Sequence, residues 1–479
     1  MPEIQEVRRK SIIGVVSYTL RTAALQMVAF VATLLLSYYL SPDQFGIYYI
    51  VVAVIGFFTF LSDVGLAAAL IQKKEEPTIE DLRTTFTVQQ VLAILIVVII
   101  IALTPIWQEK QGLQQEGLWL LYSLAFSFIL SSFKTIPSIL LERKLEFGKL
   151  VLPQILENIV FYTVAVTLAA MGYGVTSFTI AVFARSIIGL IAIYALQQWP
   201  LGISFSRQSF NSLVRFGARF QLNDLLARIK DDLFIVVLAK YLPAAQIGYL
   251  GWAKRWSLFP YQLSVNSVMS VTFPTFSRLQ EHPENLKRAV EKSLFFVMLV
   301  ILPILAGVSA LAFPITVLVE GYQKWRPALF ALHMFNLNIV FAAMFNPLIQ
   351  TMNATGRIQK TLNIMVVLTV ATWVLSPFLL MLMGYNGVAL ASAVVAVLSG
   401  YSLFYIKSFV NIDFFDQIWR QLMSAGVMIG VLYMFSNLWS KSFIMLGSGV
   451  LVGAFVYLLC IAILGFKKTK FEILSLLRK

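Results

Sequence analysis

The chain has 479 residues, of which 59% are hydrophobic and 13% are charged, whereas an average soluble domain carries about 25% charged residues. This composition excludes an ordinary soluble protein and predicts one that is embedded in a membrane. The single cysteine, Cys460, excludes an intramolecular disulfide framework, and the two histidines, His282 and His333, are too few for a histidine-based metal site. We therefore expect neither a metal ion nor a cofactor.

Apolar segments of about 20 residues, long enough to cross a membrane, recur along the whole chain. They follow one another without a long connection, which predicts an all-α polytopic membrane protein with about 14 transmembrane helices. The first segment is too long for the apolar region of a signal peptide, so we expect it to be retained. In chain order the candidate spans are residues 11–40, 45–70, 86–106, 117–140, 151–171, 175–197, 216–240, 247–273, 293–319, 327–352, 361–384, 386–410, 418–436 and 443–465.

Lysine and arginine residues are distributed unequally between the two sides of this topology. The side that holds both termini carries 24 of them near the span ends, and the other side carries five. This asymmetry predicts a protein of the cell inner membrane with both termini in the cytoplasm. It also accounts for most of the net charge of +14, so we do not expect nucleic-acid binding.

The turn before the second span resembles the turn before the eighth. The two copies, Tyr39–Gly46 and Tyr241–Gly248, read YLSPDQFG and YLPAAQIG and begin 202 residues apart. Six spans separate them, an even number, which predicts two parallel six-helix repeats around a central cavity. The predicted repeats are residues 1–200 and 201–412, and residues 413–479 form two extra transmembrane helices and a basic cytoplasmic tail.

Six charged side chains interrupt the seventh span between Arg219 and Asp232. About twelve large apolar residues favour insertion of this span by ~6 kcal/mol, whereas six mid-span charges oppose it by ~18 kcal/mol. The helix therefore cannot face lipid along its whole circumference. Helical spacing gathers Arg219, Asn223 and Lys230 on one arc, which has no acidic partner on its own helix and which favours anion binding.

A second arc of the seventh span holds Asp224, Arg228, Asp231 and Asp232. The spacing of Asp224, Arg228 and Asp232 by four residues allows a ladder of ion pairs. Such a ladder can hold helices together, or its members can belong to the binding site, and the sequence leaves both readings open.

A mid-membrane arginine in the first span matches this region through the repeat. Arg21 lies about 15 Å into that span, and the 202-residue offset places it opposite Asn223. We expect Arg21 either to bind an anion such as a pyrophosphate or to pair with Asp224. Over all the spans, eight mid-membrane bases face five acids, a surplus that suits a doubly charged diphosphate. The candidate anion-binding residues are Arg21, Arg185, Arg219, Asn223, Arg228 and Lys230. The candidates for carrying a coupling H⁺ or Na⁺ are Glu157, Asp224, Asp231 and Asp232.

Two other groups of residues have alternative roles. The aromatic side chains of the eighth span either stack on sugar rings, or form an aromatic belt at the membrane interface or contact lipid; they are Trp252, Trp256, Phe259 and Tyr261. The polar side chains of the tenth span either line a cavity or form hydrogen bonds between helices; they are His333, Asn336, Asn338 and Asn346. Lys134 is close enough to the inner end of its span for an interfacial position.

Three short motifs carry a resemblance to a known family. They are Phe45-Gly46-Ile47-Tyr48 in the first turn, Ser62-Asp63-Val64-Gly65-Leu66 at the end of span two, and Arg228-Ile229-Lys230-Asp231-Asp232-Leu233 in span seven. With their surroundings they resemble Wzx-type polysaccharide exporters of the multidrug/oligosaccharidyl-lipid/polysaccharide exporter superfamily, and the similarity covers nearly the whole chain. The third match is loose, because two adjacent aspartates compete for one position.

The resemblance implies a flippase that works by alternating access. Its cargo is a polyprenyl-pyrophosphate-linked oligosaccharide whose lipid tail stays in the membrane lipid, and polysaccharide polymerase or assembly proteins are expected partners. The product is a surface polysaccharide such as a lipopolysaccharide or exopolysaccharide. The alternatives are a peptidoglycan lipid-precursor flippase and, disfavoured by the basic surplus, a multidrug/cation antiporter. The chain has neither Gly-x-Ser-x-Gly nor His-Glu-x-x-His, so we expect no catalytic residues and no enzyme.

Overall fold

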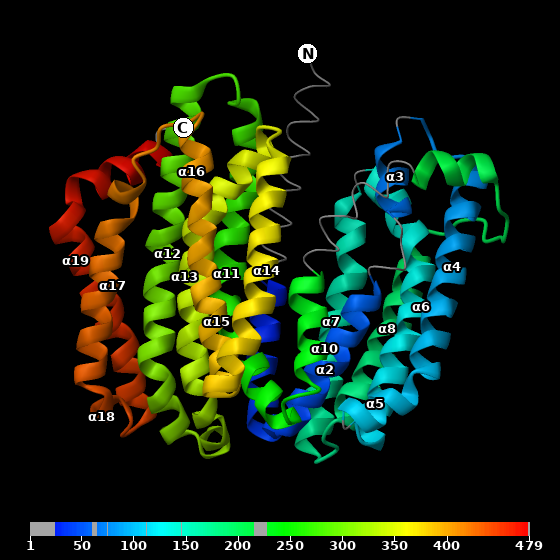
Figure 1. The fold of residues 1–479 in the computed structure, drawn as a ribbon, viewed down its shortest axis with the longest axis horizontal. Coiled ribbons are helices and arrows are strands. Elements are labelled where there is room, and N and C mark those ends of the chain that lie inside the picture. Colours follow the sequence, from blue (N-terminus) through cyan, green and yellow to red (C-terminus); the bar gives the residue numbers. More distant parts are fainter. Residues whose placement is uncertain are drawn as a thin grey trace. The chain divides into compact units, whose positions relative to one another are not determined.

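The computed structural model describes residues 24–59, 65–73, 75–111, 113–144, 146–214 and 228–477 (Figure 1). Within these residues the regular structure is helical throughout, which confirms the predicted all-α class. Ten helices of the described part are long and apolar enough to cross a membrane. Helices are the expected solution, because each backbone group in lipid needs a hydrogen-bond partner within its own segment. The count of fourteen spans stays a prediction.

The chain forms two compact units, Met1–Gly248 and Tyr249–Lys479. The three-part division at residues 200 and 412 stays a prediction about the repeats. The described helices of the first unit include Ala24–Tyr39, α2 (Pro42–Thr59), α3 (Leu66–Gln72), α4 (Ile79–Ala102), α5 (Thr104–Gln111), α6 (Gln115–Arg143), α7 (Phe147–Ala170), α8 (Thr176–Leu196), the π-helix η2 (Ile229–Leu233) and α10 (Phe234–Leu238).

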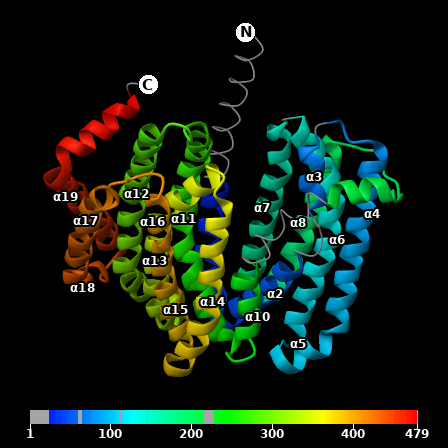
Figure 2. The same cartoon turned by 45° about the horizontal axis from the view of Figure 1, so that its top comes forward.

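Within the first unit, α4, α6, α8 and α7 pack in that order, each against the next (Figure 2). The start of α2 is set by its own sequence: the Ser41 backbone N–H donates to the Gln44 side chain at 2.9 Å, and the Gln44 N–H donates back to the Ser41 hydroxyl. This reciprocal pair is a capping box, with Pro42 at the first helical position. The turn after Tyr39 therefore begins a new helix as the sequence predicts.

One arginine holds the connection between α3 and α4. The Arg143 guanidinium, at the end of α6, donates to the backbone carbonyls of Leu70, Ile71, Lys73 and Glu75 at 2.7 to 3.1 Å. The carbonyls at a helix C-terminus lack partners within the helix, and a cation there satisfies them. This end of the first unit is thus fixed by one side chain of α6.

The second unit is built around α12. Its helices are α11, which begins in the first unit (Ala244–Arg278), α12 (Pro283–Leu318), η3 (Glu320–Ala328), α13 (Leu329–Ala354), α14 (Ile358–Met383), α15 (Tyr385–Val397), η4 (Leu398–Gly400), α16 (Tyr401–Lys407), α17 (Phe414–Met434), α18 (Ser436–Trp439) and α19 (Phe443–Leu477). The predicted extra pair corresponds to α17 and α19, and both pack on α12. The Tyr457 hydroxyl of α19 donates to the Leu299 carbonyl of α12 at 3.0 Å.

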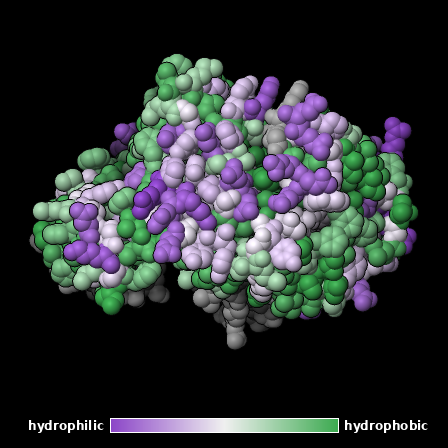
Figure 3. All heavy atoms as spheres, turned by 90° about the horizontal axis from the view of Figure 1, so that it is seen from below, coloured by the Kyte–Doolittle hydropathy of each residue, from purple (hydrophilic) through white to green (hydrophobic). Residues whose placement is uncertain are grey.

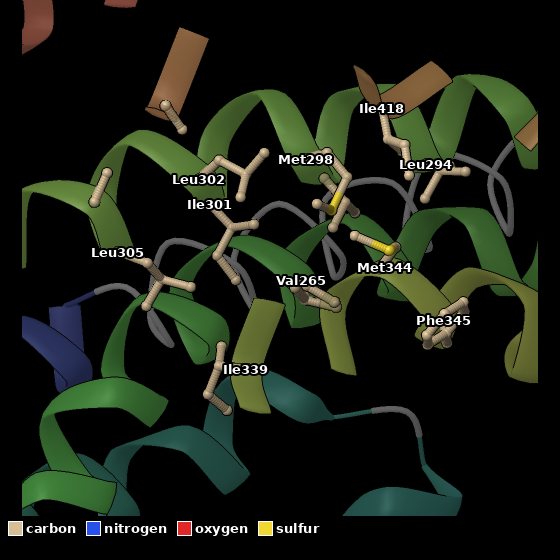
Figure 4. Close-up of a cluster of buried hydrophobic side chains, with 14 of the residues drawn as sticks. Val265, Leu294, Met298, Ile301, Leu302, Leu305, Ile339, Met344, Phe345 and Ile418 are labelled. Carbon is tan, nitrogen blue, oxygen red and sulfur yellow. The ribbon is translucent and has the colours of Figure 1, made fainter. Parts of the chain in front are cut away.

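The core of the second unit is apolar and continuous along α12. Figure 4 shows part of it, where side chains of α12 meet those of α11, α13 and α17, namely Val265, Leu294, Met298, Ile301, Leu302, Leu305, Ile339, Met344, Phe345 and Ile418. On the face seen in Figure 3, hydrophilic residues gather in the middle and hydrophobic residues lie toward the sides. This distribution is expected where the ends of membrane helices meet water and their sides meet lipid.

Candidate functional site

The seventh span is described only from Arg228 onward. Four of the predicted site residues lie outside the described part of the chain, namely Arg21, Arg219, Asn223 and Asp224. The predicted pairing of Arg21 with Asp224 therefore stays a prediction. The remaining candidates fall into two clusters of charged side chains in the first unit, one between α2 and the seventh span and one among α6, α7 and α8.

The first cluster is an ion pair seated on α2. Nη1 of Arg228 lies 3.1 Å from Oδ2 of Asp232 and donates to the Gly56 carbonyl at 3.3 Å. A Cβ atom built on Gly56 would lie 2.8 Å from the same Asp232 oxygen. The Arg228–Asp232 ion pair of the predicted ladder is therefore present, and it contacts α2 at Gly56. This favours a structural role for Arg228 and Asp232.

Lys230 has an acidic partner on its own helix, which the sequence analysis did not foresee. Its Nζ lies 3.6 Å from Oδ2 of the adjacent Asp231. The reason is local geometry: Ile229–Leu233 forms a π-helix, η2, whereas the two predicted arcs assumed α-helical spacing. A π-turn inserts a residue into the helical register and turns the side chains that follow, and such turns are frequent at functional sites.

The second cluster joins α6, α7 and α8. Nζ of Lys134 lies 2.6 Å from Oε1 of Glu157, and the two side chains are only 18% and 20% exposed. The Glu157 carboxylate packs against Gly189, where a Cβ atom would overlap it at 1.7 Å. Lys134 is thus directed toward α7, and the interfacial position expected for it stays a prediction. The pairing also neutralises Glu157, a candidate for ion coupling.

Arg185 lies one helical turn before Gly189 on α8. Its guanidinium carbon is 5.3 Å from the ring centre of Phe161, which itself follows Glu157 by one turn on α7. Among the described residues, Arg185 forms no ion pair. Its guanidinium group instead lies over the aromatic ring of Phe161. It is therefore a partly buried cation in a membrane helix with capacity to bind an anion.

The described charges of these two clusters nearly balance. Three pairs cancel, Lys134 with Glu157, Arg228 with Asp232 and Lys230 with Asp231. Arg185, the fourth cation of these clusters, forms no ion pair with a carboxylate among the described residues. Of the three carboxylates in these pairs, Asp231 has the longest ion-pair distance, 3.6 Å, and the most exposed side chain, at 48%. The described residues contain no group of three or more His, Cys, Asp or Glu side chains that could hold a metal ion.

The aromatic residues of the eighth span serve packing in the second unit. Trp252 is 4% exposed and stacks on the fully buried Trp325, with ring centres 5.0 Å apart and planes 8° apart. Phe259 is also buried. Trp252 is therefore not free to stack on sugars, and it does not belong to an interfacial belt either.

The polar residues of the tenth span, now part of α13, form hydrogen bonds between helices. The Asn336 side chain donates to the Ser309 hydroxyl of α12 at 2.8 Å, and the Asn338 side chain donates to the Ser392 carbonyl of α15 at 2.7 Å. Nε2 of His333 lies 2.8 Å from the Tyr433 hydroxyl of α17. For these three residues the structural alternative is confirmed.

Two glycines belong to the site and were missed by sequence reasoning. Gly56 and Gly189 each give a carboxylate room against a helix backbone. The available signal was a glycine inside an apolar span of a chain that carries intramembrane acids. That signal does not say which acid meets which glycine, because the pairing depends on how the helices pack.

Curated relatives are 22 to 25% identical to this chain over the parts that align. The succinoglycan biosynthesis transport protein ExoT of Rhizobium meliloti is 25% identical over 294 residues, 61% of this chain and 59% of that protein. The lipopolysaccharide biosynthesis protein WzxC of Escherichia coli is 24% identical over 74% of this chain and 71% of that protein. The teichuronic acid biosynthesis protein TuaB of Bacillus subtilis is 22% identical over 62% and 61%. The chain thus matches about three fifths of the length of the first and third relatives.

Solved structures show the same fold. The lipid II flippase MurJ in an inward closed conformation matches with a TM-score of 0.77 at 18% identity, over 94% of this chain and 98% of that one. An inward-facing multidrug resistance MATE family transporter matches with a TM-score of 0.61 at 14% identity, over 82% and 98%. The fold of this multi-pass membrane protein is therefore the MurJ and MATE fold. The polysaccharide biosynthesis protein family matches residues 35–330, more than half of the sequence, and the chain belongs to this family.

Proposed function

We propose that the chain is a flippase that moves a polyprenyl-pyrophosphate-linked oligosaccharide across the cytoplasmic membrane by alternating access. The observation that carries the proposal is Arg185, a partly buried cation of a membrane helix that lacks an acidic partner among the described residues. A guanidinium binds the oxygens of a phosphate in a bidentate manner. The printed names of the relatives, which concern succinoglycan, lipopolysaccharide and teichuronic acid, support a polysaccharide precursor as cargo.

The predicted site residues have two roles: some hold helices together, and others bind the pyrophosphate. Arg228 and Asp232 hold the seventh span on α2. Arg185 binds the pyrophosphate, and Lys230 joins it when cargo competes for the long ion pair with Asp231. Arg21, Arg219 and Asn223 complete the anion site. The lipid tail stays in the bilayer, and a polymerase receives the released unit.

Coupling to H⁺ or Na⁺ is assigned first to Asp231. Glu157 and Asp232 are each held in a closer ion pair, at 2.6 and 3.1 Å, and a paired carboxylate takes up a proton or cation only after its partner is displaced. Asp231 is more exposed and its partner is more distant. Asp224 is the second candidate. Both termini lie in the cytoplasm, as the charge asymmetry predicts.

A deletion strain tests the function. Loss of the protein is expected to stop surface polysaccharide and to cause lipid-linked repeat units to accumulate inside the cell, and the wild-type gene restores export. Arg185→Ala is expected to restore membrane protein of normal abundance without export, whereas Arg185→Lys restores part of it. Normal polysaccharide export in the deletion strain would refute the proposal.

A peptidoglycan precursor flippase is the second candidate, because the fold matches the lipid II flippase MurJ. Both cargoes carry a pyrophosphate, so Arg185 suits either one. The same deletion strain separates the two functions: a polysaccharide flippase leaves cell-wall synthesis intact, whereas a precursor flippase causes lipid-linked peptidoglycan precursor to accumulate.

A further inference from the structure

The connection from α8 to the seventh span begins with an irregular segment, residues 200–206, that we call the strap. Figure 1 shows it in green beside the end of α4 that lies next to α3. The Ser204 backbone N–H donates to the Thr87 hydroxyl of α4 at 3.2 Å, and the Ser206 N–H donates to the Thr84 hydroxyl at 3.0 Å. The strap therefore runs along the first turns of α4, within the first unit.

Both ends of the strap are fixed in the core of the first unit. Trp199 precedes the strap and Leu213 follows it, and both are buried in one apolar cluster with Leu82 and Phe86 of α4. The ring centres of Trp199 and Phe86 lie 5.3 Å apart. The side chains between these two anchors are thus held in place on α4.

Three apolar side chains of the strap are exposed. Leu201, Ile203 and Phe205 are 51, 84 and 59% exposed, and the residues that alternate with them are half-buried. Alternation with a period of two is typical of an extended chain that has one covered side. Three large apolar side chains held side by side on a protein surface indicate a contact with an apolar partner.

The face of α4 beneath the strap identifies that partner. Beyond its first turns, the exposed large apolar side chains of α4 are Val91, Ile94, Leu95, Val98 and Ile101. At 100° per residue they occupy an arc of about 120°, and Thr84 and Thr87 fall on the same arc. In a helix long and apolar enough to cross a membrane, this arc faces lipid. The strap therefore lies between α4 and the lipid, and its exposed side chains continue the apolar face of α4.

An arginine lies at each end of the strap. The Arg83 guanidinium of α4 lies against Gly202, where a Cβ atom would be 2.5 Å from Nε. Arg207 is exposed and begins the helix that follows the strap. Among the residues that the structure describes, neither arginine forms an ion pair. Basic side chains beside a membrane segment attract the anionic lipids of the cytoplasmic leaflet.

We propose that the strap is a membrane anchor, whose exposed apolar side chains insert among the acyl chains of the leaflet predicted to be cytoplasmic. Arg83 and Arg207 bind the head groups of anionic phospholipid there. Thr84 and Thr87 lie about 8 and 12 Å along α4 from its first residue, close to the depth of about 5–10 Å that is typical of interfacial anchors. Because the strap joins the two predicted repeats, the leaflet holds this connection at the membrane.

Fluorescence quenching tests the insertion. In a Cys460→Ala background, Ile203→Cys is labelled with the fluorophore NBD, and the full chain is placed in nanodiscs of phosphatidylcholine and phosphatidylglycerol. We expect a nitroxide on the acyl chains to quench this label as strongly as a label at Val98→Cys, and aqueous iodide to have little effect. A label at Glu76→Cys, an exposed position of the α3–α4 connection, is expected to show the reverse. Quenching of residue 203 by iodide as at residue 76, without quenching by the lipid nitroxide, would overturn the inference. No cargo is present, so the result does not depend on the proposed flippase function.

The lipid that carries the nitroxide tests the role of the arginines. At equal mole fraction, nitroxide-labelled phosphatidylglycerol is expected to be enriched at residue 203 over labelled phosphatidylcholine by about fivefold or more. Arg83→Gln with Arg207→Gln is expected to abolish this preference while quenching by phosphatidylcholine stays unchanged, which also shows that the strap still lies in the membrane. Arg278→Gln with Arg288→Gln, two exposed arginines of the second unit, is the matched control and is expected to keep the preference. Equal quenching by the two lipids in the protein with its arginines, or a preference that survives Arg83→Gln with Arg207→Gln, would overturn the binding of anionic head groups.

Discussion

Removal of Lys134 is expected to destabilise the first unit because it leaves the Glu157 carboxylate without its partner. Nζ of Lys134 and Oε1 of Glu157 are 2.6 Å apart, and both side chains are about four fifths covered. Breaking a buried ion pair from one side costs about 3–5 kcal/mol. Since a fifth of each side chain is exposed, we expect Lys134→Met to lower the free energy of unfolding by ~3 kcal/mol.

The double substitution separates the charge from the packing. Lys134→Met combined with Glu157→Gln removes both charges, and burying a neutral pair costs less than burying one uncompensated ion. We therefore expect the double variant to recover ~1–2 kcal/mol relative to Lys134→Met, which gives a coupling energy of similar size in a double-mutant cycle.

The assay is thermal or denaturant unfolding of the purified protein in detergent, with each single variant and the double variant side by side. Met381→Leu is a suitable control, because this side chain is 87% exposed. A loss below about 0.5 kcal/mol for Lys134→Met, or strict additivity of the two substitutions, would refute the placement of this ion pair inside the bundle.

Three further predictions concern the first unit. Gly56→Ala is expected to displace the Asp232 carboxylate, 2.8 Å from the added methyl group, and to reduce export several-fold more than it reduces protein abundance; equal losses of both would contradict this. Arg143→Ala is expected to cost ~2 kcal/mol of unfolding free energy, since four carbonyls lose a charged donor, and to increase proteolysis of the α3–α4 connection; an unchanged protease pattern would argue against it. Asp231→Asn is expected to make export insensitive to the proton or Na⁺ gradient while cargo still binds, measured in vesicles with imposed gradients; unchanged gradient dependence would shift the assignment to Asp224.

Much of the architecture follows from sequence periodicity and charge. Apolar length predicts spans because lipid cannot satisfy a bare backbone, and the helices α4, α6, α7 and α8 lie where those lengths indicate. The turn that starts α2 is likewise local, because Ser41 and Gln44 cap each other three residues apart. Features decided within one helical turn are open to prediction from sequence.

The errors concern features that depend on packing between segments. Lys134 pairs with Glu157, 23 residues away on another helix, and no local pattern in the sequence identifies that partner. Trp252 of α11 stacks on Trp325 of η3, on the far side of α12 in the sequence, and no local pattern indicates that contact. The π-helix at Ile229–Leu233 has a different spacing of side chains from the α-helix that the prediction assumed. Lys230 therefore pairs with Asp231, which α-helical spacing had placed on the other arc.

The most direct test of the central claim is translocation by the purified protein in liposomes. A fluorescent polyprenyl-pyrophosphate-linked oligosaccharide is placed in the inner leaflet, and its arrival in the outer leaflet is followed with an impermeant quencher. We predict transport by the wild-type protein, loss of about tenfold or more with Arg185→Ala, since one charge-assisted contact is removed, and partial recovery with Arg185→Lys. Transport by Arg185→Ala at the wild-type rate, or transport in liposomes without protein at that rate, would contradict the account.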